Sequence, residues 1–373
     1  MVTVDGRVET EGAVIFEGGL QASELHGSDG DLDVRGDLKI QDEINVTDGS
    51  LHVSGSLTSA DVDIDRHLEV LGALTAAKLQ AGSRVAIHGH LKAESVEVGG
   101  SLEASESAEV EEIEAGGSVR VSKQVKAKSI DVGGSVVVGG GSVTEDIDVG
   151  GTFESNGPLE FNEIDVGGSV RLKGDSLGRR IDVGGIFDVS GNLRFEEIDV
   201  GGKVSIEGDC EGEDIDVGGL LEVTGNLNLT GGLEVGGRCR IGKMLTADRV
   251  EIGGSLDAEG VKVEDIEIGG AILTKSGVKA ASIVIGDRGR VRGPLFADSV
   301  RIGEKADVEA VYGKTVTLEE KSRATLVHGV DVRIEPGCRV LGEVLYSGSL
   351  DADEGVLFTV SPKKVDSLPA ESV

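Results

Sequence analysis

Carboxylate side chains recur at one fixed position of the chain, and carboxylates repeated in this way can bind cations or the surface of a basic protein. We call this set the acidic column; it consists of Glu97, Glu114, Asp131, Asp148, Asp165, Asp182, Asp199, Asp216, Glu234, Glu251 and Glu267. Each member lies between two apolar residues, so in a β-strand its side chain points outward. On stacked parallel strands these carboxylates would lie about 4.8 Å apart.

The acidic column has two interpretations. Like charges that face each other on adjacent strands repel, so bound cations or a basic partner could offset them. Alternatively, the column is an acidic coat that prevents molecules from associating side by side. A specific calcium site requires six to eight oxygen ligands, which one flat column does not supply. We therefore predict no dedicated metal site and retain a single candidate cation ladder, formed by Asp131, Asp148, Asp165, Asp182, Asp199 and Asp216.

Repeated carboxylates also raise the possibility of a carbohydrate-active β-helical enzyme. Acid–base catalysis requires two carboxyl groups in different environments, so that one donates a proton and the other accepts one or attacks. Here a nearly identical acid recurs in repeat after repeat, and the chain has no Trp and two Tyr to stack on sugar rings. We predict no catalytic residues, and an enzyme is the least favoured of three functional hypotheses.

Other residue types with chemical potential fall on ordinary structural positions. Cys210, Cys239 and Cys338 lie on inward positions of the repeat, where a free thiol acts as a small apolar side chain. His88 and His90 share a face, but two ligands make a weak metal signal, so we expect a surface pair. Recurrent Gly-Gly pairs lead into another strand and not into a helix, unlike a phosphate-binding loop. We predict no cofactor.

A repeat of about 17 residues must position all of these side chains. The phrase Ile-Asp-Val-Gly-Gly begins at Ile130, Ile147, Ile164, Ile181, Ile198 and Ile215. Variants continue it upstream at Ile113, Val96, Leu79, Val62, Ile44, Leu25 and Val8, and downstream at Leu233, Val250, Ile266, Ile283, Val300, Val316, Val332 and Leu350. Internal repetition over nearly the whole chain indicates a solenoid.

Apolar residues within one repeat predict three short strands. After Ile181 they occupy offsets 0 and 2, 6 and 8, and 12 and 14, the last being Phe195. Each pair has the period of two that marks a strand with one buried face, and Gly184, Gly185 and Gly191 fall at corners where positive φ angles are often needed. Phe recurs at offsets 6 and 14 in alternate repeats, which suggests that large and small side chains alternate along the core. We predict an all-β, single-stranded parallel β-helix of about 20 coils over residues 1–360, followed by a disordered polar tail, 361–373.

Composition and charge exclude several partners. The chain carries 59 Gly and a net charge of −32, whereas nucleic-acid binding requires clustered Lys and Arg. Residues 1–270 hold 53 acidic and 22 basic side chains, but residues 271–373 hold 15 and 14.

We find no signal peptide and no apolar span of membrane length, and three sparse cysteines do not form a disulfide framework. We expect a cytoplasmic protein.

The ends of the predicted solenoid are its strongest functional signal. A solenoid exposes an unpaired strand edge and part of its core at each end unless a cap covers them. We expect the terminal coils to stack end to end through Val2, Val4 and Val8 at one end and Leu357, Phe358 and Val360 at the other. The alternative is that the last coil and the tail fold over the end as a cap.

The repeat resembles the bactofilin family of polymer-forming cytoskeletal proteins. The resemblance rests on residues 130–136 (Ile-Asp-Val-Gly-Gly-Ser-Val), 300–304 (Val-Arg-Ile-Gly-Glu) and 332–337 (Val-Arg-Ile-Glu-Pro-Gly). It implies a right-handed β-helix, filaments that assemble end to end without nucleotide, and roles in cell shape and protein localisation. The family often carries an N-terminal membrane-binding stretch, which this chain does not show, so membrane association is not expected.

These observations favour a cytoskeletal scaffold whose partner is a further copy of itself, with other bactofilin-like proteins as a second class of partner. The second hypothesis is a monomeric acidic rod that binds a basic protein, or that acts as a spacer or regulator of a shorter bactofilin-like polymer. The third is the β-helical enzyme.

Overall fold

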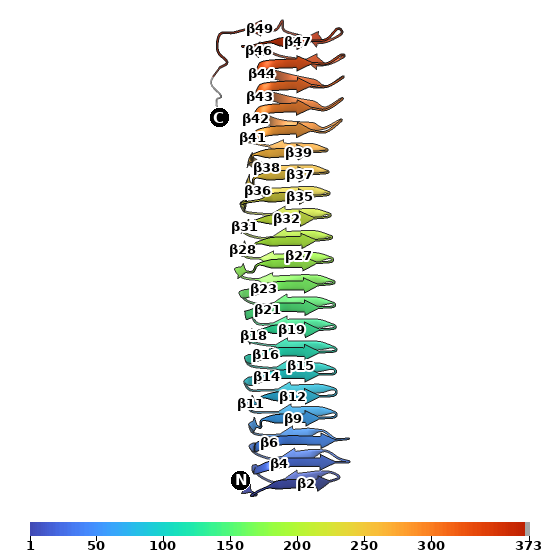
Figure 1. Ribbon diagram of the computed structural model, residues 1–373, viewed down its shortest axis with the longest axis vertical. Helices are drawn as coiled ribbons and strands as arrows, with labels where there is room; N and C mark the ends of the chain where they lie inside the picture. The colour runs from blue at the N-terminus through green and yellow to red at the C-terminus, as the bar shows by residue number, and fades with distance from the viewer. Residues whose placement is uncertain (370–373) are drawn as a thin grey trace. The chain divides into compact units, whose positions relative to one another are not determined.

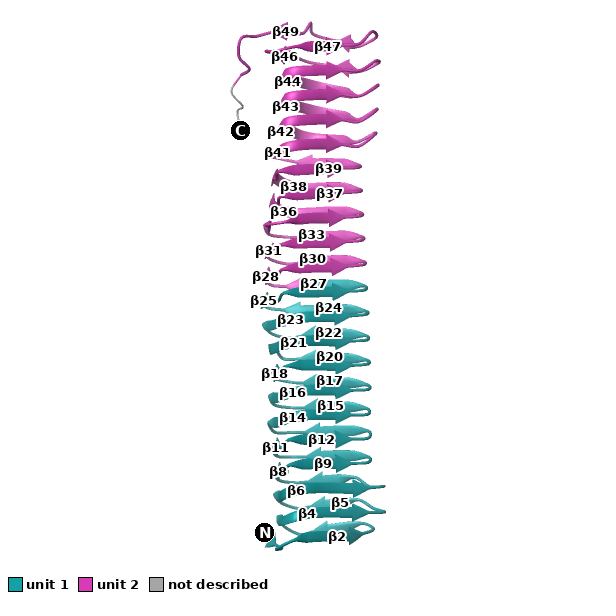
Figure 2. Ribbon diagram, in the orientation of Figure 1, with its two compact units in different colours: residues 1–188 teal, residues 189–373 magenta. Residues whose placement is uncertain are grey.

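The computed structural model describes residues 1–369 (Figure 1). All regular elements of these residues are strands, and the strands pair in parallel as a β-helix of about 21 coils, which confirms the predicted fold class. The chain divides into two compact units, residues 1–188 and 189–373 (Figure 2). Residues 370–373 of the predicted disordered tail lie outside the described residues.

One coil of the first unit illustrates how the sequence forms the strands. It contains β19 (Ser129–Val132), β20 (Ser135–Val138) and the start of β21 (Gly141–Val149). Alternate residues are buried, for example Ile130 and Val132, whereas Asp131 between them is exposed. β-Branched side chains suit this pleated, half-buried surface. Each strand therefore contributes one face to the core and one to the solvent.

The strand register confirms the predicted repeat in both units. In the first unit each starting residue pairs directly with the next, in the order Val8, Leu25, Ile44, Val62, Leu79, Val96, Ile113, Ile130, Ile147, Ile164 and Ile181. The second unit pairs Ile198, Ile215, Leu233, Val250, Ile266, Ile283, Val300, Val316, Val332 and Leu350 in the same way. Inserted residues are absorbed as local register shifts, such as the one between Ala22 and Glu24.

The Gly-Gly corners have a different physical reason from the one predicted. The backbone at Gly133 and Gly134 does not adopt a positive φ. A Cβ atom at Gly133 would lie 2.7 Å from the carbonyl oxygen of Gly116, and one at Gly134 would overlap that of Gly117. Glycine is required here because successive corners stack backbone on backbone. The expectation of positive φ was wrong for such pairs, including Gly184 and Gly185, but it is confirmed for Gly191, whose φ is 151°.

Large and small side chains alternate along the core, as predicted. Phe161 and Phe195 are buried, and each lies over a glycine of the following coil. A Cβ atom at Gly178 would overlap the ring of Phe161, and one at Gly212 would overlap the ring of Phe195. Each aromatic ring therefore fills the space left by a missing side chain.

The corners change character towards the end of the second unit. There the strands β42 (Arg290–Ile302), β43 (Asp307–Leu318) and β44 (Arg323–Ile334) run for 12 or 13 residues each. The corners before them contain Arg288, Lys305 and Lys321 with φ values of 59°, 59° and 61°. Non-glycine residues adopt this conformation at a cost of about 1–2 kcal/mol. These corners replace stacked glycines with tight turns.

The last coil extends further than predicted. It contains β47 (Leu350–Ala352), β48 (Leu357–Phe358) and β49 (Lys363–Lys364), which pair with β44, β45 (Arg339–Val340) and β46 (Val344–Tyr346). Residues 363 and 364 were expected in the disordered tail, but the free edge of β46 binds their backbone. After β49 the chain runs back beside the preceding coils (Figure 1).

Candidate functional site

The first coil presents an unpaired strand edge. It consists of β1 (Val2–Thr3), β2 (Arg7–Glu11) and β3 (Val14–Phe16). These strands pair only with β4 (Leu20–Ser28) and β5 (Leu32–Val34) among the described residues. Their other sides leave backbone N–H and C=O groups open, which is the usual template for pairing with another chain.

Two of the predicted assembly residues of this coil face the core. Val2 lies opposite Leu20 and Val8 lies opposite Leu25, and both leucines are buried. Val2 nevertheless keeps an exposed fraction of 59%, and Val4 and Val8 are half-buried. Among residues 1–369, no coil covers these inward-facing side chains from the other side.

The same surface includes two residues that the sequence analysis missed. Val14 and Phe16 lie opposite the buried Leu32 and Val34, and both are only half-buried. They occupy offsets 6 and 8 of the coil that begins at Val8, so the repeat pattern itself would have found them. We call Val2, Val8, Val14 and Phe16 the N-terminal face.

The last coil forms an equivalent surface in the second unit. Among the described residues, β47, β48 and β49 each pair with one strand only. Phe358 lies opposite the buried Val340 and therefore faces the core, as Leu350 does opposite Val332. We call Leu350 and Phe358 the C-terminal face.

The other two predicted residues of the last coil are solvent-exposed. Leu357 lies opposite the outward-facing Arg339 and is 57% exposed, so it points away from the core. Val360 is also exposed, although no strand pairing fixes its direction. The structure thus separates Phe358, on the open end of the core, from Leu357 on the side of the coil.

The acidic column is in register within each unit. Glu97, Glu114, Asp131, Asp148, Asp165 and Asp182 pair residue by residue in the first unit. Asp199, Asp216, Glu234, Glu251 and Glu267 do so in the second. All are exposed, as predicted. Partial burial raises the pKa of Asp148, and the neighbouring Asp131 and Asp165 raise it further.

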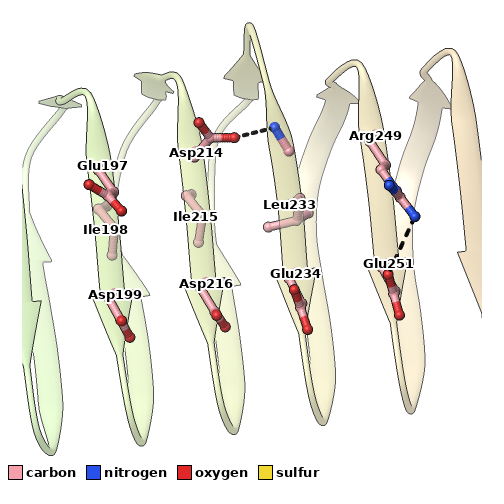
Figure 3. Close-up of a pocket in the computed structure, with 11 residues that line it drawn as sticks. Glu197, Ile198, Asp199, Asp214, Ile215, Asp216, Leu233, Glu234, Arg249 and Glu251 are labelled. Atoms are coloured by element: carbon pink, nitrogen blue, oxygen red, sulfur yellow. Dashed lines mark hydrogen bonds and ion pairs between the residues drawn. The ribbon is translucent and has the colours of Figure 1, made fainter.

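A shallow hollow lies along the second unit's acidic column, and Asp199, Asp216, Glu234 and Glu251 line it (Figure 3). It opens beside Gly232, where the neighbouring coils carry the side chains of Asp214 and Arg249. Asp214 Oδ1 accepts a hydrogen bond of 2.6 Å from the Gly232 N–H, and Arg249 Nη2 lies 3.9 Å from Glu251 Oε2. No group of three or more His, Cys, Asp or Glu side chains among residues 1–369 is arranged to hold a metal ion. The cation ladder therefore stays a prediction.

The cysteines and the histidine pair occupy the predicted environments. Cys210, Cys239 and Cys338 are buried, and burial raises the pKa of the Cys239 thiol to about 12. A thiol that stays protonated is a poor nucleophile. His88 and His90 are exposed, and His88 Nε2 lies 3.5 Å from Glu69 Oε1.

The outer surface of the second unit carries an apolar feature that the sequence analysis did not identify. Phe296, Tyr312, His328 and Leu345 lie in register on β42, β43, β44 and β46, and we call them the aromatic strip. Phe296 and Tyr312 stack with ring centroids 4.8 Å apart, and Tyr312 meets His328 edge to face at 5.2 Å. The sequence does carry a signal for this strip: aromatic rings recur every 16 residues, at a position of the repeat that is polar in other coils.

No family model, curated protein or solved structure matches the chain. The resemblance to bactofilins therefore stays a prediction based on the repeat residues. The part of the chain that the structure describes contains no helix long and apolar enough to cross a membrane.

Proposed function

We propose that this protein is a structural scaffold that assembles end to end through its terminal coils into filaments, without nucleotide. The observation that supports it best is the combination, at both terminal coils, of an open strand edge and core-facing apolar side chains that are not fully buried: Val2 is exposed and Phe358 is half-buried. Filament formation and a role in cell shape follow the resemblance to bactofilins. The expected cytoplasmic location follows from the sequence features described above, and all three belong to this proposal.

Stacking of the C-terminal face on the N-terminal face of a second copy would continue the parallel sheet across the junction. Each fully buried Val, Leu or Phe side chain contributes about 1.5–3 kcal/mol, and the open backbone groups of both edges would become paired. The two faces differ, so the contact is heterologous. Because it continues the sheet along the direction in which the coils stack, we expect it to repeat without closing into a ring. The outcome of such a contact is an open polymer.

A matched pair of substitutions in the first coil tests this proposal. Val2→Arg places a charge on the N-terminal face, where stacking would bury it without a partner. Ile15→Arg places the same charge on an equally exposed residue that points outward, opposite Asp33. In sedimentation assays we expect Val2→Arg to abolish assembly and Ile15→Arg to retain it. Equal assembly of both variants would contradict the proposal.

The opposite end provides a second test. Phe358→Arg should also prevent assembly, because its side chain faces the open end of the core. A Val2→Arg molecule keeps an intact C-terminal face and can still bind the N-terminal end of a growing filament. Added in small amounts to the wild type, it should therefore shorten the filaments, whereas a Val2→Arg/Phe358→Arg double variant should not.

The acidic columns favour a second candidate function, the capture of a basic protein. Five or six carboxylates in register in each unit form a surface with which a row of Lys or Arg side chains could pair. Binding of a lysine-rich peptide should then weaken with salt and in the triple variant Asp131→Asn/Asp148→Asn/Asp165→Asn. Binding that is insensitive to both changes would exclude this function.

A further inference from the structure

The aromatic strip faces away from the core of the second unit, yet most of it is hidden from solvent. Leu295, Val311 and Val327 precede its three rings in sequence and occupy the core. Strand alternation therefore turns Phe296, Tyr312 and His328 outward. Phe296 is nevertheless only 6% exposed and His328 only 7%. The rings cover one another in part, and Glu343 Oε2 lies 3.2 Å from His328 Nε2. A further segment of the chain lies beside the rings and adds to this cover.

The covering segment is the end of the chain itself. Residues 365–369, which we call the strap, leave the last coil where the Val365 N–H donates to the carbonyl oxygen of Tyr346 over 2.9 Å. Leu368 and Pro369 then line the same hollow of about 350 Å³ as Phe296, Tyr312 and His328. Figure 1 shows this segment running back from β49 beside the coils that carry the strip.

The chemistry of the strip suits an extended segment that contains proline. A proline-containing segment loses little conformational freedom on binding, and grooves lined by aromatic rings are a common receptor for it. The rim is polar: Lys279 Nζ lies 5.9 Å from the centre of the Phe296 ring, and Lys314 pairs with Asp298 at 2.7 Å. A Leu-Pro pair can thus contact the rings while the flanking residues stay in water.

The charge of this region permits contact with a further copy of the chain. Residues 271–373 contain 15 acidic and 14 basic side chains, in contrast to the strongly acidic preceding part. Two such surfaces do not repel each other as two acidic columns do. A strap exchanged between two copies would also make the same contacts as a strap bound to its own coils, so exchange costs little free energy.

We propose that the aromatic strip is a docking groove for an extended Leu-Pro segment, that the strap occupies it within its own chain, and that the partner it fits is the strap of a second copy. This inference does not depend on end-to-end stacking, because the strip lies on the side of the coils. In this proposal the strap of the same chain occupies the groove until it is replaced by the strap of a second copy.

The experiment uses the full chain and a labelled peptide with the sequence of residues 361–373, which represents the strap of a second copy. Leu368→Asp should release the strap by placing a charge against the rings, and Ser367→Asp is the matched control because Ser367 is exposed. Tyr312 and Tyr346 are the only tyrosines, and the chain has no Trp. Quenching of tyrosine emission therefore reports directly on this region.

We expect Leu368→Asp to increase the quenching of tyrosine by acrylamide and to bind the peptide at least about tenfold more tightly than the wild type, whose own strap competes at high effective concentration. Ser367→Asp should behave as the wild type does. Adding Tyr312→Ala to Leu368→Asp, or Leu368→Asp to the peptide, should abolish binding. Unchanged quenching in Leu368→Asp, or equal peptide binding by that variant and the wild type, would overturn the inference.

Discussion

Single residues inside the coils are selected by what stacks on them. Phe161 fits only because the next coil has a glycine beneath its ring, and Gly134 is required because the Gly117 carbonyl approaches it from the preceding corner. Neither constraint follows from the backbone angles of the glycine itself. At this scale each side chain must be considered with its neighbours one coil away.

Gly178→Ala tests the packing of aromatic rings on glycines. The new methyl group would overlap the Phe161 ring, and overpacking of this kind typically costs about 1–3 kcal/mol. We expect a lower midpoint of thermal unfolding by circular dichroism, partly restored by Phe161→Leu in the same molecule. Gly18→Ala, with open space around the new Cβ atom, should change the midpoint little; an equal loss in both variants would refute this explanation.

Asp148 provides a test of repulsion within the acidic column. Its pKa is raised above the ordinary 3.8, so its contribution to stability is greatest at low pH and is lost as pH rises through the raised pKa. Asp148→Asn should therefore raise the free energy of unfolding at neutral pH. The expected gain is about 0.2–1 kcal/mol, which is typical of removing a like charge that faces another on an adjacent strand. The gain should disappear near pH 3, as pH-dependent melting curves can show.

Glu154 in the same unit provides a control of opposite sign. Lys173 Nζ donates a hydrogen bond of 2.8 Å to Glu154 Oε1 and lowers the pKa of that carboxyl group. Its contribution to stability is present at neutral pH and is lost as pH falls through the lowered pKa. Glu154→Gln should thus destabilise the fold at neutral pH only. If both variants shifted the midpoint in the same direction, the electrostatic interpretation would fail.

At the scale of strands and corners, most of the architecture could be predicted from the sequence. Apolar residues at period two and a repeat of 17 residues determine which side chains face inward, and within each unit the starting residues pair as expected. The corners were harder to predict, because the chain turns in two different ways. At Gly133 successive corners stack closely, whereas Arg288 adopts a positive φ. Spacing alone does not distinguish these two solutions.

The surfaces were predicted less completely than the core. The acidic column follows from strand alternation, whereas the aromatic strip depends on how the 16-residue coils shift Tyr312 and His328 to outward positions. The strap could not be predicted, since its contacts with the strip join parts of the chain far apart in sequence. The polar composition of residues 361–373 instead indicated disorder.

The salt dependence of stability tests whether the carboxylates of each acidic column repel one another. Screening weakens repulsion between exposed carboxylates, so the thermal midpoint of the wild type should rise with ionic strength. The rise should be smaller in Asp131→Asn/Asp148→Asn/Asp165→Asn. If the salt only screens the carboxylates, calcium and sodium salts of equal ionic strength should raise the thermal midpoint by similar amounts. A calcium-specific rise that the triple variant loses would instead indicate a cation ladder.

At the scale of the whole molecule, the proposed end-to-end assembly requires that the terminal coils stay open. Leu368 and Pro369 of the strap line the hollow beside Phe296 and Tyr312. A cap formed by the last coil and the tail stays the alternative prediction. The core-facing Val2 and Phe358 keep part of their surface in solvent. If the acidic columns act as a coat that keeps filaments apart by charge repulsion, lateral bundling should increase with salt or divalent cations.

Negative-stain electron microscopy of the wild-type protein, at low and high salt and over a range of concentrations, tests end-to-end assembly most directly. We expect unbranched filaments, one molecule wide, whose length increases with protein concentration in the absence of nucleotide. Discrete particles of a single length at every concentration and salt would contradict it, and would leave the acidic columns as the surfaces that carry the function.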